Sequence, residues 1–233
     1  VASNLSREWI DRDGVDMIIE SMDSAAAIAT QNIGKEKNVL TIAAGSASST
    51  LTNAECAATG IHYVYDTYSL ATGTGNAIVK NGLTDWYFIT ADYAFGHSLE
   101  ENTANVVKGL GGNVVGTVRH PFKATDYSSF ILQAQSSGSD VVALANAGTD
   151  FSTSLKQASE FGVVQGGQTI AGMLVFLSDI YALGLNVAQG LTYTTGFYWD
   201  HNDETRAFSQ RFKERHGSMP TMIHAGFYSA VTH

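Results

Sequence analysis

Short apolar runs alternate with longer segments of helical periodicity along the chain. Buried parallel strands are short apolar runs of this kind, whereas amphipathic helices repeat their apolar residues every three or four positions. The sequence predicts strands at residues 15–20, 39–44, 61–65, 86–90, 113–119, 141–145, 169–176 and 191–195. It predicts helices at residues 1–12, 24–36, 70–82, 97–109, 127–136, 150–161, 204–216 and 222–233. This alternation indicates an α/β protein with parallel sheets flanked by helices.

The number of strand–helix units indicates two domains. More than eight such units would crowd a single open sheet, so two similar lobes fit the pattern better. The chain would cross between the lobes near residues 65–68 and 194–197, which are short strand-like segments rather than Gly/Ser linkers. We therefore expect one lobe to contain residues 1–66 and 196–233, and the other to contain residues 67–195.

Two structural expectations concern single side chains in the first lobe. In the helix at residues 1–12, Leu5, Trp9 and Ile10 are expected to share one face, with charged residues opposite. The single cysteine, Cys56, excludes an internal disulfide and a cysteine-built metal site. Small thiol side chains are usually buried, so Cys56 is expected to be a buried apolar residue rather than a reactive thiol.

Composition narrows the classes of function. The 233 residues are 44% hydrophobic and 15% charged, which is typical of a globular protein. A net charge of -9 with only 13 Lys and Arg residues argues against binding to nucleic acid or to an anionic membrane surface. No apolar stretch approaches the roughly 20 residues of a membrane span, so the chain is not expected to insert into a membrane.

Four of the predicted strands end in loops of small, polar or aromatic residues. The loop at residues 45–50 is rich in hydroxyl groups and is expected to leave backbone N–H groups open to a solute. The equivalent loops are residues 22–25, 92–96 and 146–149. Open α/β sheets bind ligands at the carboxyl ends of their strands, so these loops are expected to line a common cleft. In the 92–96 loop, an equal alternative is that Asp92 caps the next helix and the aromatic residues pack inside.

No set of residues in the sequence indicates catalysis. Asp92, His97 and Cys56 carry suitable groups, but nothing fixes their geometry, and His97 has the position of an exposed histidine at a helix start. The seven histidines lack the spacing of metal ligands, and no nucleophile elbow, Walker loop or zinc-protease motif occurs. Several loops without an activated nucleophile predict binding without catalysis, metal or cofactor.

The chain resembles the periplasmic solute-binding components of branched-chain amino-acid type ABC transporters, the Leu/Ile/Val-binding-protein-like family. The stretches that carry the resemblance are REWIDRDGVDMIIE, YVYDTYSLA, WYFITADYAFGHSLE, DYSSFILQAQSSGSDVVALANAG, LKQASEFG and FYWDHNDETRAFSQRFKERHGSMPT. The resemblance implies the type I periplasmic binding protein fold, with two Rossmann-like lobes that close on a ligand at a hinge. It also implies a monomer in the periplasm that delivers its ligand to an ABC transporter permease.

The same resemblance implies that the chain is a fragment. Family members have a strand and a helix before the position of Val1 and a further stretch after that of His233. The first lobe is therefore expected to be incomplete and to lack part of the ligand contacts.

The resemblance implies ligand contacts at Asp23, Ser24, Ala44, Gly45, Ser46, Tyr93, Phe95, Asn146, Ala147 and Leu174. Ser24 has the place of the serine that binds an α-carboxylate in the family. Ala44 and Ser46 have the places of the backbone donor and the hydroxyl group that assist it. Phe95 stands where amino-acid binders typically have tyrosine.

One position departs from the pattern of amino-acid binders. These proteins hold the α-ammonium with an acidic residue that should lie within residues 172–175, which here read GMLV. Leu174 takes its place, and a buried ammonium without a carboxylate partner costs several kcal/mol. We therefore expect an apolar or aromatic carboxylate as the ligand, lined by Phe95, Leu174 and Tyr93. Family members with the YAFGH and ANAG patterns include binders of aromatic acids.

Three alternatives stay open at this point. A branched-chain or other apolar amino acid is the alternative ligand within the same family. An effector-binding domain of a regulator or receptor has the same two-lobed fold, and a helix-turn-helix before Val1 would mark it. An α/β enzyme is the third alternative, although no residue set supports it.

Overall fold

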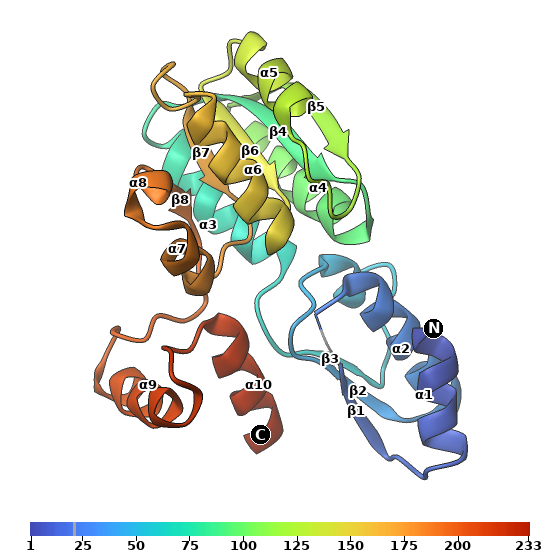
Figure 1. Ribbon diagram of the computed structural model, residues 1–233. Helices are drawn as coiled ribbons and strands as arrows, with labels where there is room; N and C mark the ends of the chain where they lie inside the picture. Colours follow the sequence, from blue (N-terminus) through green and yellow to red (C-terminus); the bar gives the residue numbers. More distant parts are fainter. Residues whose placement is uncertain (21) are drawn as a thin grey trace. The chain divides into compact units, whose positions relative to one another are not determined.

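The computed structural model describes every residue except Ser21 (Figure 1). The chain divides into two compact units. Unit 1 contains Val1–Asp66 and Gly196–His233, and unit 2 contains Thr67–Thr195. Each unit is built on a parallel sheet flanked by helices, which confirms the predicted α/β class.

Unit 2 is an open parallel sheet with strand order β5-β4-β6-β7-β8. Figure 1 shows helices on both faces of this sheet. The strands are β4 (Asp85–Ala91), β5 (Asn113–His120), β6 (Val141–Ala145), β7 (Thr169–Gly172) and β8 (Thr192–Tyr193). The helices are α3 (Thr67–Val79), α4 (Ala94–Gly109), α5 (Ser128–Ser136), α6 (Thr149–Glu160), α7 (Leu177–Leu183) and α8 (Leu185–Ala188).

The central strands of unit 2 are buried on both faces, which explains why they read as continuous apolar runs. Successive side chains of a strand point to opposite faces. On one face, Tyr87 and Ile89 of β4 belong to a core cluster with Phe151 of α6 and Ile131 of α5. Burial of such residues removes apolar surface from water and supplies most of the stability of the sheet.

Unit 1 contains a three-stranded parallel sheet with order β1-β2-β3. Its strands are β1 (Met17–Glu20), β2 (Leu40–Ala43) and β3 (Gly60–His62). Its helices are α1 (Ala2–Asp11), α2 (Ser24–Lys37), the short 3-10 helix η1 (Ser49–Thr52), α9 (Asp203–His216) and α10 (Met222–Thr232). The second segment of unit 1 packs on the first, because Ala230 and Phe227 of α10 contact the cluster around Ile42 and Ala44.

Every predicted strand is present, but those predicted at residues 15–20, 39–44, 61–65, 169–176 and 191–195 are shorter than predicted. The predicted strand at residues 169–176 ends at Gly172, because the chain leaves the sheet there while Met173 to Phe176 stay buried. The residues after Gly172 are as apolar and buried as the strand itself, so the composition does not show where the strand ends. The predicted strand at 191–195 is reduced to β8. The helices α7 and α8 and the 3-10 helix η1 are not predicted from the sequence.

The structure adds detail to one side-chain expectation in unit 1 and contradicts another. Leu5 and Trp9 of α1 are 39% and 37% exposed, and the residue of α1 that is buried is Ser6. The hydroxyl of Ser6 donates to Thr30 Oγ1 at 3.2 Å, so α1 packs on α2 through a polar pair rather than an apolar face. Cys56 is exposed rather than buried, because it follows the turn after η1 instead of lying in a strand or helix.

The contact between α9 and α10 predicts a pH dependence of stability. Phe212 of α9 lies against the rings of His216 and His224, at centroid distances of 4.9 and 4.8 Å. His224 Nδ1 accepts a hydrogen bond from the Thr221 backbone N–H at 3.0 Å, which caps α10. Burial, and then the neighbouring His216, lowers the pKa of His224 below its usual range. Protonation would remove the acceptor that caps the helix.

The neutral form of His224 therefore contributes stability that is fully present above about pH 6.5 and is lost as the pH falls through the lowered folded-state pKa. We expect the melting temperature to fall when the pH is reduced from about 7.5 to 5. A thermal denaturation series should show a flatter pH dependence for His224→Gln than for the wild type. The exposed His201 serves as the control, and an equal slope for His224→Gln and His201→Gln would contradict the assignment.

Candidate functional site

In unit 1, the structure brings together the loops that follow β1 and β2. Asp23 is the N-cap of α2, and its carboxylate accepts the Ala26 backbone N–H at 2.7 Å. Ser24 begins the helix and is buried. Its hydroxyl oxygen accepts the backbone N–H of Ser48 at 3.3 Å. Ser24 and the loop after β2 therefore form one structure at the carboxyl edge of this sheet, as parallel strands place them.

The loop after β2 is covered, not open as the sequence predicts. Ala44, Ser46 and Ser48 are fully buried. His62 Nε2 lies 2.8 Å from the carbonyl oxygen of Ser46, and the hydroxyl of Tyr65 donates to the carbonyl of Gly45 at 3.5 Å. The side chains of His62, the last residue of β3, and of Tyr65, which follows this strand, thus hold the loop in place. This contact was not visible in the sequence because it joins loops about 20 residues apart.

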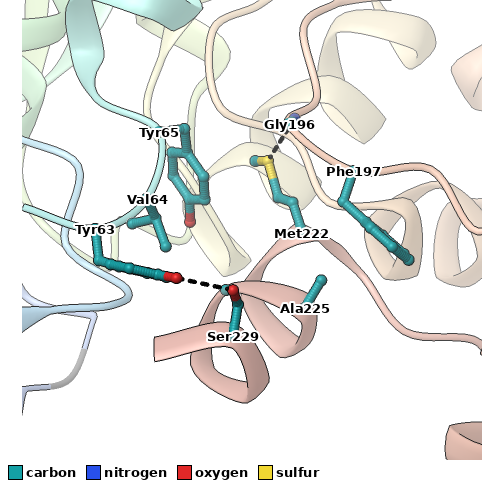
Figure 2. Close-up of a pocket in the computed structure, with 9 residues that line it drawn as sticks. Tyr63, Val64, Tyr65, Gly196, Phe197, Met222, Ala225 and Ser229 are labelled. Carbon is teal, nitrogen blue, oxygen red and sulfur yellow. Dashed lines mark hydrogen bonds between the residues drawn. The ribbon is translucent and has the colours of Figure 1, made fainter. Parts of the chain in front are cut away.

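A pocket of about 290 Å³ lies beside this loop within unit 1 (Figure 2). The Tyr63 hydroxyl and Ser229 Oγ are 3.0 Å apart, and the Gly196 backbone N–H donates to Met222 Sδ at 3.4 Å. The pocket is mostly apolar with hydroxyl groups at its edge, and none of its residues was predicted. The aromatic run YVYDTY is the sequence signal that could have located it. Its lining is Tyr63, Val64, Tyr65, Gly196, Phe197, Met222, Ala225, Gly226 and Ser229.

In unit 2, an aromatic group follows β4 and β5. Tyr93 lies 5.8 Å from the ring of Phe95 and 5.0 Å from the ring of Phe122. Phe95 is buried, whereas Phe122 is 55% exposed and has the ammonium of Lys123 at 5.3 Å from its ring centre. Phe122 and Lys123 were missed, although the segment His120-Pro121-Phe122-Lys123 follows a predicted strand and so had the position of a ligand loop.

Asp92 does not cap α4, so this part of the alternative for the 92–96 loop is wrong. No side chain caps α4, whose N-cap residue is Tyr93. The Asp92 carboxylate instead lies 2.8 Å from His97 Nε2 and 3.8 Å from the guanidinium of Arg119. His97 is partly exposed, as predicted, and its partner is an acid at the surface. These pairs orient charged side chains at the edge of the loop and do not activate a nucleophile.

A buried polar network lies at the carboxyl ends of β5 and β6. The hydroxyl of Tyr127 donates to Asp150 Oδ1 at 2.9 Å, and the Lys123 backbone N–H donates to Asp150 Oδ2 at 3.1 Å. Burial, followed by the hydrogen bond to Asp150, raises the pKa of Tyr127 above its usual range. The ring of His120 packs edge-on against Tyr127 at 4.8 Å. Asn146 follows β6, is fully buried, and joins this network through His120, while Ala147 is partly exposed.

Leu174 is 6% exposed in an apolar segment after β7, between Met173 and Val175, which are both buried. The first acidic residue that follows is Asp179. Its carboxylate accepts the Phe176 backbone N–H at 2.9 Å, at the start of α7. Burial raises the pKa of Asp179, an effect only partly offset by the hydrogen bond from Phe176. The Asp179 carboxylate is therefore occupied at the start of α7.

The described residues contain no group of three or more histidine, cysteine or acidic side chains that could hold a metal ion. Within the same residues, every helix is too short or too polar to cross a membrane. What both units do offer at their sheet edges is a set of hydroxyl, amide and aromatic groups, which suits recognition of a small organic molecule.

Comparison with known proteins supplies the family. The profile of a family described as periplasmic binding protein matches residues 1–233. A solved periplasmic binding protein from Burkholderia mallei is 45% identical, with a TM-score of 0.96 over 99% of this chain and 61% of its own. A branched-chain amino acid ABC transporter periplasmic ligand-binding protein from Burkholderia xenovorans LB400 is 37% identical, with a TM-score of 0.84 over 98% of this chain and 61% of its own.

A more distant structure shows the fold alone. This solute binding protein of an ABC transporter from R. palustris, in complex with benzoate, is 20% identical, with a TM-score of 0.84 over 98% of this chain and 63% of its own. The chain spans about half, 53%, of the length of the curated relatives it matches, which are Leu/Ile/Val-binding protein homologs of Brucella at 25% identity over 91% of this chain.

Proposed function

Because the chain belongs to the periplasmic binding protein family, we propose that it is the substrate-binding component of an ABC importer. In this proposal it works in the periplasm as a monomer. It captures a small carboxylate, preferably an aromatic or apolar acid, by closure of its lobes and delivers it to a membrane permease. The observation that carries the choice of ligand is the buried Leu174, with no acidic side chain in residues 172–175.

The argument from Leu174 concerns the ammonium of a free amino acid. A buried ammonium needs a carboxylate partner, because desolvation without one costs several kcal/mol. Asp179, the next acid along the chain, is engaged by the Phe176 backbone N–H. A ligand with a carboxylate and an apolar body avoids this cost, so such a ligand fits the segment after β7 better than an amino acid does.

The groups proposed to contact the ligand lie in loops at the carboxyl ends of the strands. Ser24, Ala44, Gly45 and Ser46 are proposed to hold the carboxylate, and Asp23 fixes the start of the helix that carries Ser24. The aromatic residues Tyr93 and Phe95, with Leu174, are proposed to contact the apolar body, together with Asn146 and Ala147. The exposed Phe122 extends this aromatic group.

Two alternatives are compatible with these findings, and the first has specific support. The names of the B. xenovorans protein and of the Brucella homologs favour a branched-chain amino acid as the ligand. The fold is also compatible with the effector-binding domain of a regulator or receptor, since fold alone does not define function.

Calorimetric titration of the intact protein with benzoate, cinnamate, leucine and valine tests the proposal. We expect an aromatic acid to bind more tightly than either amino acid. Ser24→Ala and Ser46→Ala should each weaken its binding by about 1–3 kcal/mol, whereas Ser218→Ala at an exposed position should have no effect. Nanomolar binding of leucine would overturn the choice of ligand, and equal binding by all three variants would remove both serines from the site.

A further inference from the structure

A cleft of about 350 Å³ opens at the amino-terminal edge of the sheet in unit 2. Its walls are the end of α6, the loop that follows this helix, the start of β7, and α8 (Figure 1). Val164 and Gln165 come just before β7, and Gly190 comes just before β8. The strands of this sheet are parallel, so the loops of the candidate site leave it at the opposite, carboxyl edge. The cleft is therefore separate from the candidate site.

Uncharged hydrogen-bonding side chains surround this cleft. Gln165, Asn186 and Gln189 contribute side-chain amides, and Ser159 contributes a hydroxyl group. Within the described residues, none of these four side chains forms a hydrogen bond to the protein. Every other asparagine and glutamine side chain of unit 2 forms one, except that of Asn105 on α4. The amides that have no protein partner are thus concentrated around one cleft, where a ligand could use them together.

The base of the cleft is aliphatic and belongs to the core of unit 2. Ile170 of β7 is 3% exposed and is a member of the main core cluster, and Val187 of α8 packs against that cluster. The packing of these residues in the core fixes the base of the cleft whether or not a ligand is bound. A volume of about 350 Å³ lies within the range of small-molecule sites, near its lower end. The cleft therefore has the size and the apolar base of a site for a small molecule.

The polar groups of the cleft favour a neutral ligand with several hydroxyl groups. The described residues that line the cleft include no charged side chain, so an ion would lose its hydration there without gaining an opposite charge. A side-chain amide donates through its NH₂ group and accepts at its oxygen, and a hydroxyl group likewise both donates and accepts. A ring that carries several hydroxyl groups can bind the three amides at once while its C–H groups contact the aliphatic base.

We propose that this cleft is a second binding site, for a neutral polyhydroxylated small molecule of the size of a monosaccharide or a cyclitol. Gln165, Asn186 and Gln189 bind its hydroxyl groups, and Ile170 and Val187 contact its ring carbons. The site is independent of the proposed carboxylate ligand, because it shares no residue with the groups assigned to that ligand.

Two-dimensional ¹H–¹⁵N NMR of the intact, ¹⁵N-labelled protein tests this proposal with myo-inositol and D-glucose as probes. At least one of the two should change the side-chain NH₂ signals of Gln165, Asn186 and Gln189, and these changes should fit a single dissociation constant. Cyclohexanol has the carbon ring of inositol with a single hydroxyl group. It should bind at least about tenfold more weakly than the better probe, because it lacks most of the hydrogen bonds.

Two variants test the amides directly. Gln165→Met and Asn186→Leu keep a similar volume and remove the hydrogen-bonding groups, so each should weaken binding of the better probe by about three- to tenfold. Asn105→Leu is the matched control, because Asn105 is also an exposed amide without a protein partner but lies outside the cleft. This control should keep the wild-type affinity. All three positions are exposed, so the variants are expected to fold, which circular dichroism checks.

Three results would overturn the proposal. The first is that neither probe changes the signals of the cleft, and the second is that cyclohexanol binds as tightly as the better probe. The third is that Gln165→Met and Asn186→Leu both bind the probe with the affinity of Asn105→Leu. None of these results bears on the carboxylate ligand, which the titrations with benzoate and leucine test separately.

Discussion

Replacing Asp150 with alanine is expected to lower the free energy of unfolding by about 3 kcal/mol. Asp150 is buried at the start of α6 and accepts hydrogen bonds from the Tyr127 hydroxyl and from the Lys123 backbone N–H. Alanine would leave both donors without a partner, and each buried donor that loses its acceptor costs about 1–3 kcal/mol. Urea denaturation followed by circular dichroism measures the change.

Two further variants show whether the cause is the lost hydrogen bonds. Asp150→Asn keeps one acceptor oxygen and should lose less stability than Asp150→Ala. Glu101→Ala, at an exposed position of α4, should change the free energy of unfolding by less than about 0.5 kcal/mol. If Asp150→Ala were as stable as Glu101→Ala, the buried network around Tyr127 would not contribute to the stability of unit 2.

Gly96→Ala is expected to destabilise the protein by about 2–3 kcal/mol and to abolish tight binding of the ligand. A Cβ atom on Gly96 would lie 2.0 Å from the carbonyl oxygen of Ala91 and 2.9 Å from its carbonyl carbon. Both atoms belong to the backbone at the end of β4, so no side-chain rotation relieves the clash. The start of α4 would have to move away from the strand and take Tyr93 and Phe95 with it.

Gly109→Ala at the other end of the same helix provides the control. A Cβ atom there would meet nothing within 4 Å, and alanine is the better helix former. This variant should be as stable as the wild type or slightly more stable, with unchanged binding. Equal behaviour of the two variants in thermal denaturation and calorimetry would contradict the close contact between α4 and β4.

The family and the fold class could be predicted from the sequence, and both are confirmed. Buried parallel strands leave a strong signal, because both of their faces must be apolar, as in residues 141–145. Once the strands are predicted, the loops at their carboxyl ends can be found from their position in the sequence. The contributions of these loops to ligand binding stay predictions.

The parts that were missed depend on contacts between distant residues. Tyr127 and Asp150 are 23 positions apart, and neither residue type indicates a buried hydrogen bond on its own. The covered state of the Ser46 loop follows from His62, which belongs to the next strand. Leu5 and Trp9 have the spacing of a shared helix face, but both are partly exposed, and the buried residue of α1 is Ser6, which pairs with Thr30. The apolar periodicity of a helix shows which residues share a face, but it does not show which face packs against the rest of the protein.

The central claim is that the protein binds a carboxylate and has no acidic side chain at residues 172–175 to pair with an ammonium group. Leucine and 4-methylpentanoate share the same carbon skeleton and carboxylate and differ only in the amino group, so their affinities isolate this claim. Calorimetric titration of both ligands into the intact protein should show that 4-methylpentanoate binds at least about tenfold more tightly, because leucine must bury an unpaired charge. Tighter binding of leucine would contradict the account.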